Sequence, residues 1–121
     1  MSPESVKSLH AAFPDVDVHI HEADFTRPLD LTPLDGIVMA NALHFVADQR
    51  PIVALLRTYL KPGGRFVLVE YGTDHGNRWV PYPLSYSTWE NLARASGFQT
   101  TRLLASRPSR FLGAIYAALS E

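Results

Sequence analysis

The sequence predicts an α/β domain in which helices cover both faces of a mostly parallel sheet and an antiparallel hairpin closes the C-terminal end. Three observations support this prediction. Helical and strand-like periodicities alternate along the chain. A Pro-Gly-Gly turn leads from a helix into the apolar strand RFVLVEY at 65–71. Two later apolar runs, 98–105 and 110–118, are joined only by the short segment SRPSR, which favours antiparallel neighbours.

The first third of the chain is predicted to contain a helix, a strand, a loop and a second strand. Residues 4–13 carry apolar side chains at helical spacing, and residues 16–22 alternate apolar and polar side chains as a strand does. The segment 23–36 is rich in Pro and Asp and is predicted to be a loop. The apolar run GIVMA at 36–40 is predicted to be a short strand buried on both faces.

Two further helices are predicted, at 49–60 and 85–98. Asp48 is the expected N-cap of the first, because its carboxylate can accept a hydrogen bond from a free backbone N–H. Ser87 and Glu90 stand three residues apart and are expected to form a capping box for the second. Each helix is followed by an apolar run, so the chain alternates helix and strand to its end.

Composition narrows the class of protein. The 121 residues carry a formal net charge of −1 and contain no cysteine, which excludes a disulfide framework and a thiolate metal site. Lys and Arg are spread along the chain, so we expect neither nucleic acid nor a membrane surface as a partner. The N-terminus lacks the apolar stretch of a signal peptide, and we expect a cytoplasmic protein.

Several segments together carry a family resemblance. DGIVMANALHFV at 35–46, then a helix, LKPGGRFVLVEY at 60–71, a helix ending in SGF and a closing hairpin resemble the second half of a class I S-adenosylmethionine-dependent methyltransferase. The resemblance implies a truncated Rossmann-like methyltransferase fold. In that family, GIVMA is the fourth strand, RFVLVEY the fifth, and the hairpin supplies the sixth and seventh.

The sequence departs from this family at the cofactor loop. None of its seven glycines forms GxGxxG or GxGxG, the loop whose bare backbone approaches the cofactor. We therefore interpret residues 1–121 as a single methyltransferase-like domain that lacks the first strand-helix-strand unit. S-adenosylmethionine is the cofactor that the resemblance implies, and we expect the isolated chain not to bind it with useful affinity.

The resemblance places four residues at the cofactor. Asp24 and Phe25 belong to ADF, which resembles the motif after the third strand, whose acid meets the adenine amino group. Asn41 and Ala42 leave the carboxyl end of the GIVMA strand, where open α/β sheets bind ligands. The alternatives are that Asp24 caps a turn and that Asn41 ends the strand by bonding its own backbone.

Five residues are predicted to form a substrate pocket at the same edge of the sheet: His44, Tyr71, His75, Trp79 and Tyr82. Their mixture of aromatic and polar groups suits a small apolar acceptor with one or two polar handles. Histidine is a common general base near neutral pH, but a lone histidine before a helix is more often a surface or capping residue. No catalytic residue is assigned. In the alternative, the loop is only structural, and Trp79 and Tyr82 pack on the core.

Two histidines form a separate feature. His19 and His21 lie two residues apart on the predicted strand and could hold a metal ion with a third ligand. We interpret them instead as part of a solvated strand face and expect no metal site.

Two classes of function remain open from the sequence. The chain is a methyltransferase-like protein related to small-molecule methyltransferases, or it is a non-catalytic binding or assembly module. A split enzyme, in which a partner supplies the glycine loop, is a variant of the first. GIVMA would lose a neighbouring strand in the absence of the first unit, so we expect a homodimer through that exposed sheet edge.

Overall fold

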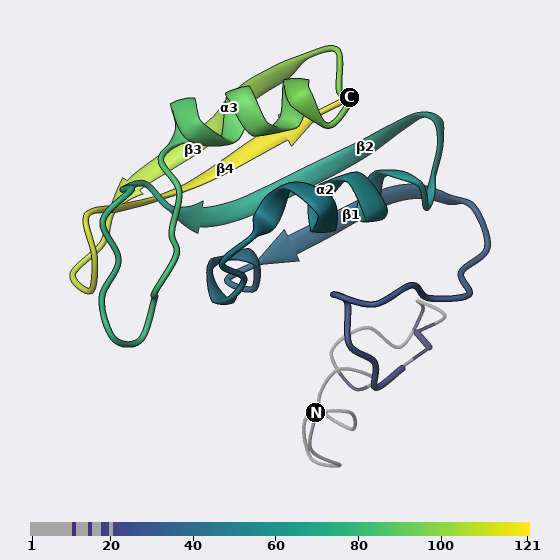
Figure 1. Ribbon diagram of the computed structural model, residues 1–121, viewed down its shortest axis with the longest axis horizontal. Coiled ribbons are helices and arrows are strands. Elements are labelled where there is room, and N and C mark those ends of the chain that lie inside the picture. The colour runs from purple at the N-terminus through teal and green to yellow at the C-terminus, as the bar shows by residue number, and fades with distance from the viewer. Residues whose placement is uncertain (1–10, 12–14, 16–17, 20) are drawn as a thin grey trace.

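The computed structural model describes residues 11, 15, 18, 19 and 21–121 (Figure 1). Over these residues, no helix is long and apolar enough to cross a membrane. Strands and helices alternate up to α3, and two strands follow it. The elements are β1 (Leu34–Ala40), the 3₁₀ turn η1 (Leu43–Phe45), α2 (Gln49–Arg57), β2 (Leu60–Tyr71), α3 (Tyr86–Ala95), β3 (Thr101–Pro108) and β4 (Ala114–Ser120).

The four strands form one sheet in the order β1-β2-β4-β3. β1 runs parallel to β2, and β4 is antiparallel to both β2 and β3. The C-terminal hairpin is therefore confirmed, whereas the prediction of a mostly parallel sheet is matched only in part: the described residues form one parallel pair and two antiparallel pairs. The predicted strand at 16–22 would have added to the parallel part. Its described members, Val18, His19, His21 and Glu22, lie outside any strand, and the others lie outside the described residues.

Both α2 and α3 lie on the same face of the sheet, in front of the strands in Figure 1. In the part of the chain that the structure describes, helices therefore cover one face of the sheet (Figure 1). The helix predicted at 4–13 falls almost wholly outside the described residues.

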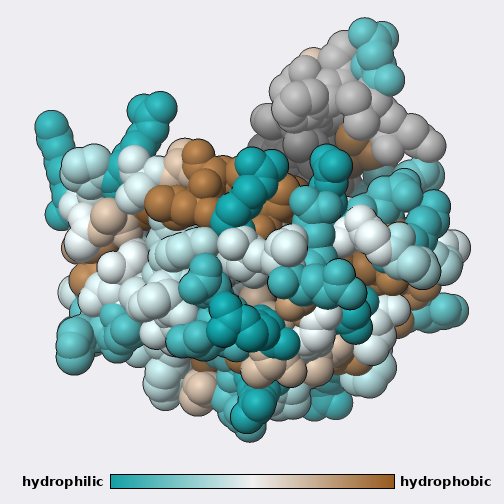
Figure 2. Space-filling model, turned by 90° about the horizontal axis from the view of Figure 1, so that it is seen from above, coloured by the Kyte–Doolittle hydropathy of each residue, from teal (hydrophilic) through white to brown (hydrophobic). Residues whose placement is uncertain are grey.

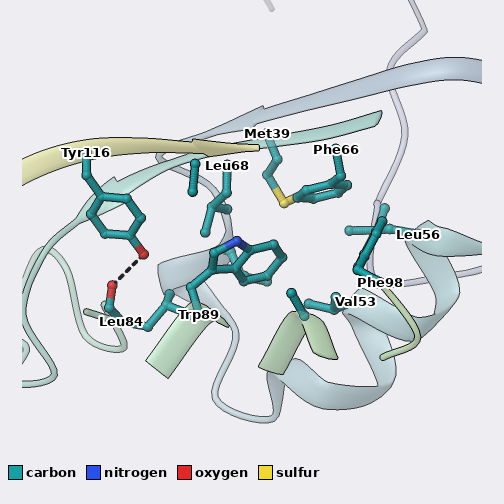
Figure 3. Packing of buried hydrophobic residues seen from close by; sticks show 12 residues of the cluster. Met39, Val53, Leu56, Phe66, Leu68, Leu84, Trp89, Phe98 and Tyr116 are labelled. Atoms are coloured by element: carbon teal, nitrogen blue, oxygen red, sulfur yellow. Dashed lines mark hydrogen bonds between the residues drawn. The ribbon is translucent and has the colours of Figure 1, made fainter. Parts of the chain in front are cut away.

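The core lies between these two helices and the sheet. Trp89 of α3 is fully buried, and its ring stacks on Phe66 of β2 with centroids 5.5 Å apart (Figure 3). Val53 of α2 joins the same cluster. The Tyr116 hydroxyl of β4 donates a hydrogen bond of 2.8 Å to the Leu84 carbonyl, so a polar contact anchors the segment before α3 to the sheet.

The opposite face of the sheet is apolar and only partly covered. Alternation along β2 turns Val67 and Val69 to this face, and both are half-buried. Val38 of β1 is 72 % exposed, so the prediction that GIVMA is buried on both faces is wrong. The reason is that β1 is the edge strand of the described sheet and no described helix covers this face. Figure 2 shows hydrophobic atoms gathered near the upper margin, on the side that faces away from the viewer in Figure 1.

The helix ends differ from the predicted ones in detail. α2 begins after Asp48, but the Asp48 side chain makes no capping hydrogen bond. The N-cap of α3 is Ser85, whose Oγ accepts a hydrogen bond of 3.3 Å from Thr88 N. The predicted capping box of Ser87 and Glu90 is wrong, because the helix begins two residues earlier than that pair requires.

Candidate active site

The most unusual feature of the core is a buried pair of titratable side chains, His44 and Glu70. Nδ1 of His44 lies 2.7 Å from Oε1 of Glu70, and the two side chains are 3 % and 0 % exposed. Glu70 Oε1 also accepts a hydrogen bond of 2.8 Å from Tyr71 N. The burial of His44 excludes its interpretation as a surface residue.

The local fold explains how these two side chains meet. Glu70 continues the alternation of Phe66 and Leu68 on the helix-covered face of β2, so it points into the core near the carboxyl end of the strand. β1 runs parallel to β2 and ends at Ala40, and the chain then turns into η1, which carries His44. The carboxyl ends of two parallel strands lie at one edge of the sheet, which brings the pair together.

Hydrogen bonds from two segments hold η1 in place. Tyr82 N donates to the His44 carbonyl at 2.9 Å, which links the 72–85 loop to the turn. Gln49 Nε2 donates to the carbonyls of Tyr82 at 2.8 Å and Leu43 at 3.2 Å. The position of His44 is therefore fixed by both the loop and the start of α2.

Aromatic rings extend from His44 across this edge. The His44 ring lies 6.0 Å from Tyr71, the Tyr71 ring lies 5.8 Å from Phe111, and Phe111 lies 6.4 Å from Trp79. The exposed Phe45 ring packs edge-on against His44 at 4.4 Å. The structure thus links the predicted pocket residues His44, Tyr71 and Trp79 through a ring that was not predicted.

The remaining pocket residues lie on the same loop but differ in their contacts. Tyr82 is 47 % exposed and lines a hollow of about 420 Å³ together with Gln49 and Asp74. His75 is exposed, and its backbone N donates to Thr73 Oγ1 at 3.2 Å.

Asp24, which was predicted to bind the cofactor, makes its hydrogen bonds to a residue two positions along the chain. The Asp24 carboxylate accepts hydrogen bonds from Thr26 N at 3.0 Å and Thr26 Oγ1 at 2.7 Å. The Thr26 hydroxyl is the main cause that lowers the pKa of Asp24 below its ordinary value. This geometry is that of an Asp capping its own turn. Phe25 is half-buried against the core cluster.

Asn41 and Ala42 connect β1 to η1. Asn41 has a φ of 54°, in the left-handed region that Asn tolerates better than most residues, and its N donates to the Val69 carbonyl at 3.1 Å. Ala42 is half-buried and precedes η1. Within the described residues, no group of three or more His, Asp or Glu side chains is arranged to hold a metal ion.

Two neighbouring groups have shifted pKa values. Burial, with Glu70 adding to it, raises the pKa of Tyr116 above its usual range, so the hydroxyl stays protonated and donates to Leu84. A hydrogen bond from Ser85 N is the main cause that lowers the pKa of Asp74. That carboxylate also accepts from Ser85 Oγ at 3.0 Å and fixes the start of α3.

Sequence reasoning missed Glu70, Phe45 and Phe111. A signal for Glu70 was present, since it is a single acid on the buried face of a strand whose other members there are Phe66 and Leu68. Phe45 follows His44 directly in the sequence. No sequence signal placed Phe111 here, because it reaches this edge only through the pairing of β4 with β2.

Comparison with known proteins settles the family. Residues 1–68 match the sequence profile of the methyltransferase domain. The chain belongs to the class I S-adenosylmethionine-dependent methyltransferase family. With the assignments made from the sequence, the sheet order β1-β2-β4-β3 places the fourth and fifth strands of the family beside the closing hairpin.

Curated relatives of this methyltransferase-family chain include bacterial and fungal proteins. An uncharacterized methyltransferase of Mycobacterium tuberculosis is 36% identical over 78 residues, which cover 64% of this chain and 31% of the relative. A hybrid PKS-NRPS synthetase of a Fusarium species is 26% identical over 84 residues, which cover 53% of this chain and 2% of the synthetase. The matched part therefore spans about a third of the mycobacterial protein and a small fraction of the synthetase.

Solved structures share the fold. The CMeT domain of the citrinin polyketide synthase has a TM-score of 0.70 at 11% identity, covering 98% of this chain and 36% of that one. A methyltransferase of Thermotoga maritima, described as a possible histamine N-methyltransferase, has a TM-score of 0.69 at 14% identity, covering 85% of this chain and 63% of that one.

Proposed function

We propose that this chain forms part of a methyltransferase that acts on a small molecule, with His44 as the general base. The observation that carries the proposal is the buried contact of 2.7 Å between His44 Nδ1 and Glu70 Oε1. The pair lies at the carboxyl ends of β1 and β2, the edge at which open α/β sheets bind ligands.

The hydrogen bonds of Glu70 assign the proton on His44. Because Glu70 Oε1 already accepts from the Tyr71 N–H, we assign it as the acceptor and His44 Nδ1–H as the donor. Nε2 then keeps a lone pair that can take a proton from an acceptor hydroxyl or an acidic carbon. Glu70 would orient the ring and stabilise the imidazolium that forms.

The acceptor class follows from the surroundings of His44. The rings of Phe45 and Tyr71 flank it, and such a lining suits a small, mainly apolar molecule. The names of several relatives, among them polyketide synthases and the citrinin polyketide synthase CMeT domain, support a small-molecule acceptor.

Methyl transfer tests the role of His44. Transfer of labelled methyl groups to a panel of phenols and β-diketones is measured for the wild type, His44→Gln and the matched control His21→Gln, with a glycine-rich strand-loop-helix unit joined upstream. We expect a loss of about 100-fold or more for His44→Gln, in the range of general base catalysis. His21 is exposed and lies outside the predicted pocket, so the control should retain activity. Equal rates for both variants would contradict the proposal.

We further propose that the isolated chain does not bind S-adenosylmethionine, which supplies the methyl group in this family. The 121 residues contain no glycine-rich motif, and the Asp24 carboxylate is engaged by Thr26 and Arg27. The chain's own residues thus do not fit the cofactor unaided. Isothermal titration with S-adenosylmethionine and S-adenosylhomocysteine checks this, and a micromolar Kd, about −8 kcal/mol, would overturn it.

An assembly role is the second candidate, favoured by the exposed edge of β1. Val38 on this strand is 72 % exposed, and β1 is an end strand of the described sheet. Such an edge can pair with a second copy, or with a partner that supplies the glycine loop of a split enzyme. We propose a homodimer and the cytoplasm as its compartment. Light scattering at micromolar concentration decides the first point, since a 13.5 kDa particle would exclude the dimer.

A further inference from the structure

We infer that Phe111, at the tip of the β3–β4 hairpin, forms with Trp79 an aromatic wall that selects a flat, conjugated methyl acceptor. The inference deepens the proposed function and rests on it for the identity of the ligand as acceptor. It adds a residue that determines specificity, contributed by the last hairpin of the chain.

The ring contacts make this wall continuous with the buried base. From His44, the series runs through Tyr71 at 6.0 Å and Phe111 at 5.8 Å to Trp79 at 6.4 Å. Phe111 is therefore the link between the end of β2 and the 72–85 loop. An acceptor seated against Phe111 would lie at the same edge of the sheet as His44, with the Tyr71 ring between them.

The hairpin tip that carries Phe111 is held rigid by its own backbone. Ser109 Oγ accepts hydrogen bonds from Phe111 N at 3.1 Å and Leu112 N at 3.3 Å. Ser109 N donates to the Gly113 carbonyl at 2.8 Å, with Gly113 at a φ of 54°. The backbone that carries the ring is thus fixed before any ligand arrives, which lowers the entropic cost of binding.

The backbone at Trp79 is fixed by a similar set of hydrogen bonds. Asn77 Oδ1 accepts hydrogen bonds from Trp79 N and Val80 N, each at 2.9 Å, and Asn77 N donates to the Val80 carbonyl. The Arg78 guanidinium lies 5.7 Å from the centre of the Trp79 ring. Two unrelated loops therefore each use a polar side chain to present one aromatic ring at the same edge.

Both rings are accessible to a ligand. Trp79 is 64 % exposed and Phe111 is 51 % exposed, and Tyr71 connects Phe111 to the buried His44. The two rings meet edge-to-face at 69°, so a flat conjugated molecule can stack on one ring while its edge meets the other. A saturated molecule lacks the π-surface that this stacking needs. A second copy of the chain is the competing occupant.

Binding of two matched probes tests the inference without a methyl donor. The first probe is 2-naphthol, which is flat and carries one hydroxyl, and the second is decahydro-2-naphthol, which has the same skeleton but is saturated. Dissociation constants are measured by NMR titration for the wild type, Phe111→Ala and Phe111→Leu. Leu104→Ala is the control, because Leu104 is an apolar residue of β3 with a similar exposure of 46 %.

We expect the wild type to prefer the flat probe and both Phe111 variants to bind it about fivefold more weakly, with Leu104→Ala unchanged. Unchanged thermal unfolding in Phe111→Leu would separate loss of the ring from loss of the fold. Equal binding of 2-naphthol by wild type and Phe111 variants, absent binding, or a Phe111 effect confined to self-association in light scattering would overturn the inference. Because no methyl transfer is read, these outcomes are independent of whether His44 is the base.

Discussion

The two faces of β2 differ more than any other neighbouring surfaces of this molecule. Phe66, Leu68 and Glu70 alternate onto the face covered by α2 and α3, and each is 0 % exposed. Val67 and Val69 lie between them on the opposite face and are only half-buried. One face of this strand is thus fully buried in the core, and the other is an apolar surface that is only partly buried.

This difference shows which face of the sheet is buried by the chain's own helices. The helix-covered face holds the core and the His44–Glu70 pair, so the candidate active site is built on the part that the chain's own helices complete. The opposite face depends on something other than α2 and α3 for cover. Its apolar side chains are the kind of patch that another polypeptide buries.

The largest expected effect comes from breaking the covered face at its centre. Trp89→Ala removes a fully buried indole that stacks on Phe66, and we expect a loss of about 4 kcal/mol in the free energy of unfolding. Trp79→Ala is the matched control; its ring is 64 % exposed, so the loss should stay below about 1 kcal/mol. Urea unfolding measures both, and equal losses would contradict the description of the core.

Neighbouring residues of β2 compare the two faces directly. Leu68→Ala should cost about 3 kcal/mol, because it leaves a cavity under the helices. Val69→Ala, one residue along on the other face, should cost about 1 kcal/mol, since the side chain is only partly buried in the chain alone. If Val69→Ala and Leu68→Ala lowered the free energy of unfolding by the same amount, the opposite face would be covered in solution.

A smaller effect on stability is expected at the start of α3, one of the two helices that cover the sheet. The Asp74 carboxylate accepts from Ser85 N at 2.8 Å, and this bond lowers the pKa of Asp74 below its ordinary value of 3.8. A lowered pKa stabilises the fold above the ordinary value, and the stabilisation is lost as pH falls through the lowered one. Asp74→Asn should therefore lose less than about 1 kcal/mol at neutral pH, because the group is exposed.

The pH dependence provides the check on this residue. Thermal unfolding of the wild type should weaken more steeply than that of Asp74→Asn as the pH falls below about 4. Parallel curves for the two proteins would show that the carboxylate does not stabilise the start of α3.

The smallest expected change in stability is at the exposed edge. Val38→Lys replaces a side chain that is 72 % exposed, so the free energy of unfolding of the monomer should change by less than about 0.5 kcal/mol. A lysine on an edge strand opposes pairing with another strand. The substitution should abolish the proposed dimer in sedimentation experiments, and a dimer that survives it does not use this edge.

Local sequence patterns predicted much of the framework but not its details. Periodicity identified the four strands and both helices of the described region, and the short SRPSR connection identified the hairpin. The boundaries shifted by several residues; the helix predicted at 49–60 ends at Arg57 because β2 already begins at Leu60. An apolar run does not indicate which face of a strand a helix covers, so the burial of Val38 was predicted wrongly.

The sequence by itself determined the family, the alternation of helix and strand, and the residues that leave the strand ends, because these depend on motifs and on periodicities of neighbouring residues. Only the tertiary structure decided that His44 meets Glu70 and that Phe111 meets Tyr71 and Trp79. These partners lie far apart in the sequence and are brought together by the parallel pairing of β1 with β2 and the antiparallel pairing of β2 with β4. Strand pairing depends on contacts over the whole sheet, which no local pattern encodes.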